Sequence, residues 1–167
     1  RWALEHRGVE LAGYRELWRW SVDDLDGFWR AVAEYFDLVG EGWGGRALAE
    51  ERMPGAVWFP EARLNFAENV LRPASDPGRR DETAILDITE ADVETRITWA
   101  ELSARVGALA NWLREQGVAP GDRVAAVLPN LPEAIVGLLA TAAVGAIWTI
   151  NSPDLSARAR LDRLTQL

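Results

Sequence analysis

The residues that could do chemistry are few in this chain, and the most promising group is the turn Ser152, Pro153 and Asp154. The turn follows an apolar run, AIWTI, typical of a buried strand, and precedes an arginine-rich helical pattern. Ligands of parallel α/β sheets bind beyond the carboxyl ends of the strands, and helix N-termini hold anions. The turn is therefore our candidate site for a phosphate or another anion. The alternative is that these residue types merely start the helix.

Most familiar catalytic groups are excluded. The chain has no cysteine, and all 18 of its cationic residues are arginines, so a thiolate nucleophile, a phosphate-loop lysine and a Schiff-base lysine are ruled out. His6 is the single histidine and stands near the chain start without partners, so we expect a surface position. Asp23, Asp24 and Asp26 are read as a solvated helix face. We expect no catalytic residue and no metal site here.

Composition indicates a globular protein and argues against several partners. Of the 167 residues 49% are apolar and 26% charged, and the net charge of −8 argues against nucleic acid, which needs a basic face. Without cysteine, a cytoplasmic location is the natural expectation. The apolar tract Val124 to Ile150 is interrupted by prolines and is expected to form a helix and a strand, with no membrane span, because spanning needs about 17–25 residues.

The second part of the sequence, residues 81–167, has the rhythm of an α/β domain. Two short strands, TAILDI and TRIT, flank a polar turn, and Thr98 with Glu101 forms a capping box for a helix that Gly117 ends. The buried stripe of this helix is Leu102, Val106, Leu109 and Leu113. A strand DRVAAVL, an apolar helix from Pro132 to about Val144, and AIWTI follow. This alternation predicts a parallel sheet covered on both faces.

A last helix is expected to begin near Pro153 or Ser156. Its periodicity predicts Leu161 and Leu164 inward and the following charged residues outward: Arg158, Arg160, Asp162 and Arg163.

The first part, residues 1–80, is aromatic-rich and expected to be helical or irregular. Ser21 is the expected N-cap of a helix of about four turns. GEGWGGR, Gly40 to Arg46, has the glycine spacing of a dinucleotide fingerprint but follows a helix rather than a strand, so we interpret it as a plain connection. Pro60 is expected to set a short helix with Leu64, Ala67 and Leu71 inward. PASDPGRR reads as a turn-rich linker.

Several segments resemble one enzyme superfamily. The segments that carry the resemblance are, in chain order, DLDGFWRAVAEYFDL, WFPEARLNFAENVL, and the frame TWAEL, GVAPGDRVA and LPNLPE. Through them the chain resembles the acyl-CoA synthetase, or adenylate-forming, superfamily, and within it the short-chain ligases of the acetoacetate type. The resemblance implies the first part of a layered parallel-sheet adenylation domain, preceded by an aromatic-rich N-terminal segment that packs on it. Neither end resembles a natural terminus, so we expect a piece of a longer protein that has the rest of its own chain as partner.

The resemblance also implies a reaction and its cofactors. Acetoacetate would attack ATP, with Mg²⁺ bound, to give acetoacetyl-AMP and pyrophosphate, and coenzyme A would then displace AMP. The lysine-ending phosphate loop, the ribose-binding aspartate and the catalytic lysine of the family have no counterpart here, so this piece alone is expected to be inactive. In related ligases the turn matching Ser152 to Asp154 lies by the coenzyme A nucleotide. The sequence departs from the pattern at Ile150, Asn151 and Leu155.

Two alternatives remain open at this stage. One is a ligase for acetate, propionate or another acid. The other is a non-catalytic α/β binding module.

Overall fold

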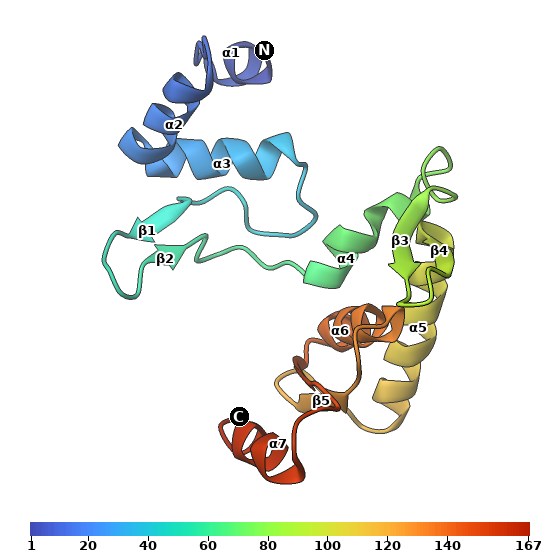
Figure 1. Ribbon diagram of the computed structural model, residues 1–167. Coiled ribbons are helices and arrows are strands. Elements are labelled where there is room, and N and C mark those ends of the chain that lie inside the picture. Colours follow the sequence, from blue (N-terminus) through green and yellow to red (C-terminus); the bar gives the residue numbers. More distant parts are fainter. The chain divides into compact units, whose positions relative to one another are not determined.

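The computed structural model describes residues 1–167, which form two compact units, Arg1–Leu64 and Asn65–Leu167 (Figure 1). The expected change of organisation near residue 80 falls inside the second of these units. The chain contains both helices and strands, in agreement with the expected α/β fold class. Its elements are, in order, α1 (Trp2–Arg7), α2 (Tyr14–Asp23), α3 (Leu25–Tyr35), β1 (Leu48–Glu50), β2 (Val57–Trp58), α4 (Phe66–Leu71), the 3₁₀ turn η1 (Arg72–Ser75), β3 (Thr83–Ile88), β4 (Glu94–Thr98), α5 (Trp99–Glu115), β5 (Arg123–Val127), α6 (Pro132–Val144), β6 (Ile147–Asn151) and α7 (Ala157–Leu164).

The second unit is built around a β–α–β crossover. Strands β5 and β6 pair in parallel from Arg123 opposite Ile147 to Val127 opposite Asn151, and α6 connects them. Two neighbouring strands that run in the same direction need such a crossover, because a tight hairpin turn can join only antiparallel strands. The parallel pairing confirms the sequence prediction.

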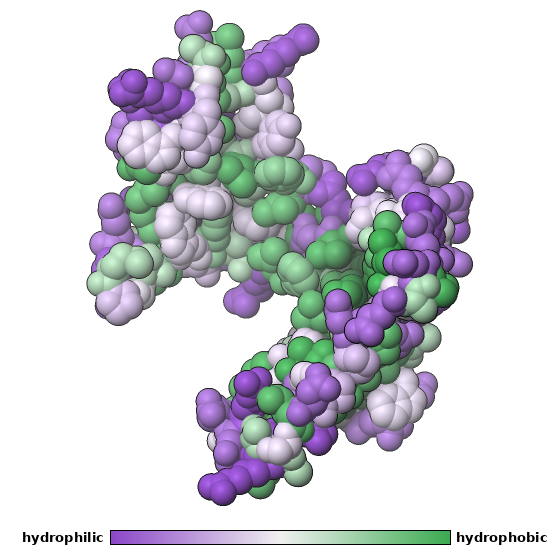
Figure 2. Space-filling model, in the orientation of Figure 1, coloured by the Kyte–Doolittle hydropathy of each residue, from purple (hydrophilic) through white to green (hydrophobic).

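The expected cover on both faces of this sheet is not found within the chain. The sheet has two strands, and apolar side chains on them, including Val127 and Ile147, stay more than 40% exposed. Only α6 packs closely on the pair, because no second helical layer of the chain reaches its other face. Apolar surface is also exposed on β3 and around α4, as Figure 2 shows.

The core of the second unit lies between α5 and α6. Thr98 and Glu101 form the predicted capping box, in which the Thr98 backbone N–H donates to Glu101 Oε2 at 2.8 Å. Leu102, Val106 and Leu113 are buried as predicted, and Leu109 packs half-buried against them. The antiparallel hairpin of β3 and β4 confirms the two predicted strands.

The last helix differs from its prediction. Ser156 is its N-cap and accepts a hydrogen bond from Ala159 N at 3.2 Å. Leu161, expected inside, is 61% exposed, whereas Arg160, expected outside, is half-buried, as is Leu164. The expected orientation of Leu161 and Arg160 is wrong because little of the chain packs against α7, so apolar periodicity does not fix its inner face.

In the first unit the predicted start of the main helix is also wrong. Ser21 lies inside α2 and donates to Trp18 O, while Asp24 caps α3 and accepts from Gly27 N at 2.9 Å. The predicted helix is therefore shorter, 11 residues, because Asp24 caps it at Leu25 and Ser21 belongs to the preceding helix α2. Aromatic rings pack edge-to-face between the two helices, Trp20 against Phe28.

The glycine-rich segment 40–46 joins α3 to β1, which agrees with its interpretation as a connection. Gly42 has φ of 76°, and a Cβ there would lie 2.0 Å from Glu61 O, so the close approach of two backbones requires glycine. Glu41 and Arg63 exchange both backbone hydrogen bonds beside it.

The helix expected to start at Pro60 starts later. Pro60 lies in a turn, Leu64 is 51% exposed, and Asn65 caps α4 by accepting from Ala67 N at 2.9 Å. The prediction that Leu64 faces inward is therefore wrong, since that residue precedes the helix. The other end of the Asn65 amide donates from Nδ2 to Ala142 O at 2.8 Å, which ties α4 to the last turn of α6.

Substitution of Gly137 tests the packing of α6 on β6. A Cβ at this position would lie 2.5 Å from the Trp148 ring, so we expect Gly137→Ala to destabilise the fold by about 1–3 kcal/mol. Gly107, in α5, has open space around its Cα, and Gly107→Ala is the matched control, expected to stabilise by about 0.5–1 kcal/mol. Urea unfolding measures both, and a neutral Gly137→Ala would contradict the close contact.

Substitutions of Asn65 distinguish how much each of its two hydrogen bonds contributes to stability. Asn65→Asp keeps the acceptor that caps α4 but removes the donor to Ala142 O, so we expect a loss of about 1–2 kcal/mol. Asn65→Ala removes both and should lose more. Stability equal to wild type for Asn65→Asp in thermal or urea unfolding would show that the Ala142 contact contributes nothing.

The stability of the first unit should depend on pH through the carboxyl group of Asp26. The hydrogen bond from Leu48 N lowers the pKa of this carboxyl below its ordinary value, and Arg30 adds to the effect. Because the pKa is lower in the folded state, the stabilisation is complete above the ordinary pKa of 3.8 and is lost as the pH falls through the folded value.

We expect Asp26→Asn to cost about 1 kcal/mol at neutral pH, as a partly exposed charge-assisted hydrogen bond does. The difference from wild type should vanish in strong acid. Hydrogen exchange of the α3 amides at several pH values measures this, and a difference independent of pH would exclude the carboxylate as its source.

Candidate cofactor-binding site

The candidate site Ser152, Pro153 and Asp154 lies directly beyond the carboxyl end of β6. Because β5 and β6 are parallel, the turn after β5, Pro129 and Asn130, leaves the same edge of the sheet. All three site residues are exposed. The fold therefore brings them to the edge where ligands of such sheets bind, and α7 follows at once.

The turn is organised by its own hydrogen bonds. Ser152 Oγ donates to Asp154 Oδ2 at 2.9 Å, Asp154 N donates to Ser152 Oγ at 3.3 Å, and Leu155 N donates to Ser152 O at 3.3 Å. Two backbone N–H groups that were expected to face an anion are thus engaged within the turn. A ligand that used them would have to exchange these bonds, of which the two at 3.3 Å are long.

The charge near the turn is opposite to that of the whole chain. From 152 to 164 there are two acidic residues against three arginines, in a protein whose net charge is −8. Arg158 and Arg163 are exposed, while Arg160 is half-buried and its Nε has no acceptor within the chain. An anionic ligand at this edge would meet guanidinium groups, which suit phosphate oxygens.

Asn151 is the residue that sequence reasoning noted only as a departure from a pattern. It is 3% exposed, the last residue of β6, and its Nδ2 makes no hydrogen bond within the chain. Its burial could not be read from the sequence, because an asparagine before a turn is usually solvated.

The remaining polar candidates have structural positions. His6 is exposed on α1, stacks on the Trp2 ring and contacts Trp2 O through Nδ1 at 3.0 Å.

The chain contains no group of three histidine, aspartate or glutamate side chains that could hold a metal. No helix combines the length and apolar character needed to cross a bilayer.

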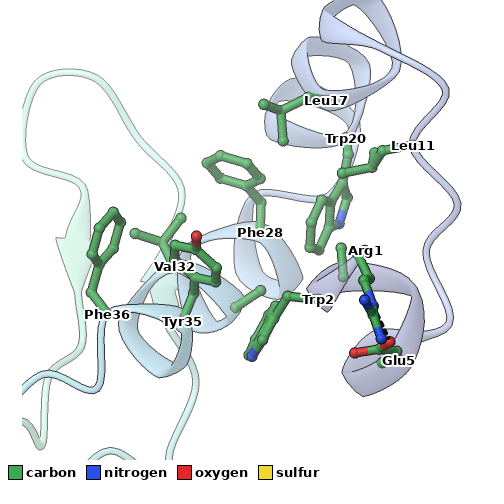
Figure 3. Close-up of a pocket in the computed structure, with 12 residues that line it drawn as sticks. Arg1, Trp2, Glu5, Leu11, Leu17, Trp20, Phe28, Val32, Tyr35 and Phe36 are labelled. Atoms are coloured by element: carbon green, nitrogen blue, oxygen red, sulfur yellow. Dashed lines mark hydrogen bonds and ion pairs between the residues drawn. The ribbon is translucent and has the colours of Figure 1, made fainter.

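A hollow lies within the first unit, among α1, α2 and α3 (Figure 3). Its volume is about 650 Å³, and Trp2, Trp20, Phe28 and Tyr35 line it. At its edge Arg1 pairs with Glu5 at 2.8 Å. The aromatic enrichment of the first part signals this hollow, although the sequence does not show which rings share it.

Two known protein families match parts of the chain. Residues 74–166 match the family of AMP-binding enzymes, and residues 14–70 match the acetyl-coenzyme A synthetase N-terminus. The first match covers more than half of the 167 residues, and the chain belongs to the AMP-binding enzyme family.

Relatives resemble the chain over nearly its whole length. It is 47% identical to an acetoacetyl-coenzyme A synthetase of Rhizobium meliloti over 99% of the chain, and 36% identical to a malonamoyl-CoA synthetase of Penicillium aethiopicum over 96%. The solved acetoacetyl-CoA synthetase of Streptomyces lividans matches 99% of it with a TM-score of 0.90 and 51% identity. The chain spans about a quarter of the length of these proteins, 25%, 22% and 25% respectively.

Proposed function

We propose that this chain is the N-terminal part of an AMP-forming acid–thiol ligase that activates acetoacetate and transfers it to coenzyme A. The observation that carries the proposal is the match of 99% of the chain, in sequence and in fold, to acetoacetyl-CoA synthetases. A cytoplasmic location, expected from the lack of cysteine, is part of the same proposal.

The reaction has two steps in this proposal. A carboxylate oxygen of acetoacetate attacks the α-phosphorus of ATP and pyrophosphate leaves, then the coenzyme A thiol attacks the acyl carbon and AMP leaves. Positioning and charge neutralisation carry such steps. Mg²⁺ would come with the ATP phosphates, since the chain offers no cluster of ligands for it.

The chain itself supplies structure and one edge of the cofactor site. Ser152, Pro153 and Asp154 would lie by the coenzyme A nucleotide, supported by their place beyond β6 and by the arginines of α7. The chain has no lysine, so within these 167 residues only arginine could neutralise the acyl phosphate.

The names of two relatives favour one class of acid. Acetoacetate and malonamate, the acids implied by those names, share a carboxylate with a carbonyl group two carbons away and differ only in a methyl against an amino group. We infer a preference for small 3-oxo acids over acetate or propionate. Hydrogen-bond donors placed for the second carbonyl would reject acids that lack it, because those donors would be left unpaired.

Acid-dependent exchange of pyrophosphate into ATP tests this proposal. It should be measured on the natural gene product that contains these 167 residues, with acetoacetate, malonamate, acetate and propionate. We expect kcat/KM for acetoacetate to exceed that for acetate by about 100-fold or more. Preference for acetate would make the protein an acetyl-CoA synthetase, and no exchange with any acid would leave a non-catalytic binding module.

A further inference from the structure

The buried amide of Asn151 stands out among the polar groups of the second unit. Its backbone carbonyl accepts from Leu128 N at 3.2 Å and it pairs with Val127 at the end of β5, so its position at the sheet edge is fixed. Its side chain is 3% exposed, yet Nδ2 has no acceptor within the chain. A buried donor without a partner costs about 1–3 kcal/mol, so such groups are rare unless they serve a purpose.

The purpose is suggested by the neighbouring residues. Asn151 directly precedes the exposed turn Ser152 to Asp154, which is held by its own hydrogen bonds. When a ligand draws on those groups, the turn must rearrange, and the amide of the residue directly before it is a donor still without a partner in the chain. Unsatisfied groups of this kind cluster where a site exchanges partners.

We propose that Asn151 is a positioning residue for coenzyme A: its buried amide holds the Ser152–Asp154 turn in the form that receives the nucleotide. The inference rests on the proposed function. Asn151 acts through the turn and does not touch the reacting atoms, so it serves the second half-reaction alone.

Thr141 provides a matched control. It is fully buried at 0% exposure, and its Oγ1 likewise lacks a partner within the chain. It lies near the end of α6, where Ala146 N donates to Thr141 O at 3.1 Å just before β6 begins. Because α6 runs back between two parallel strands, Thr141 is at the edge opposite the candidate site. Thr141 therefore has no part in the Ser152–Asp154 turn.

The experiment compares Asn151→Leu and Thr141→Val in the natural gene product that contains this chain. Both substitutions remove an unpaired polar group and keep a side chain of the same branched shape. For Asn151→Leu we expect KM for coenzyme A to rise about 5–30-fold, the factor that one hydrogen bond represents, with acetoacetate-dependent pyrophosphate exchange within about twofold of wild type. The melting temperature should stay equal or rise. Thr141→Val should leave KM for coenzyme A unchanged.

Asn151→Asp is a second variant, of the same size and without the donor, in case the leucine disturbs the fold. An unchanged KM for coenzyme A in both Asn151 variants, or an equal loss of pyrophosphate exchange, would overturn the positioning role while leaving the ligase function intact. Absence of pyrophosphate exchange in the wild-type protein would instead overturn the proposed function, and the role of Asn151 with it.

Discussion

The burial of α6 is the constraint on which the second unit depends. The helix is apolar on nearly all sides, so it must pack against neighbours around its circumference. It does so by lying between α5 and the β5–β6 pair, and Gly137 allows the Trp148 ring to approach its backbone. The crossover that α6 provides also makes β5 and β6 parallel and brings both following turns to one edge.

The end of α6 needs polar partners that an apolar helix cannot supply. Its last carbonyls have no intrahelical donors. Asn65 Nδ2 donates to Ala142 O at 2.8 Å and Arg114 Nη2 donates to Ala143 O at 3.1 Å, from α4 and α5 respectively. Residues distant in sequence thus complete the helix, and the segment WFPEARLNFAENVL contributes to this end of α6 through Asn65.

The sequence predicted those features that depend on local patterns. The capping box at Thr98, the buried stripe of α5 and the hairpin follow from spacing over a few residues, the parallel pair follows from the order of strand, helix and strand, and all are present. The failures at Ser21, Leu64 and Leu161 have another origin. Each depends on which of several competing caps or faces is used, and that choice is made by neighbouring elements rather than by the local pattern.

The candidate site shows the same division between local and non-local information. The position of Ser152 to Asp154 beyond a strand could be predicted, because the order of strand, turn and helix fixes it. The burial of Asn151 could not, since it depends on the tertiary packing around the end of β6 rather than on the neighbouring residues in the sequence. At this edge a strand end fixed by parallel pairing is followed directly by an exposed turn, and this combination is the basis for our proposal that coenzyme A binds there.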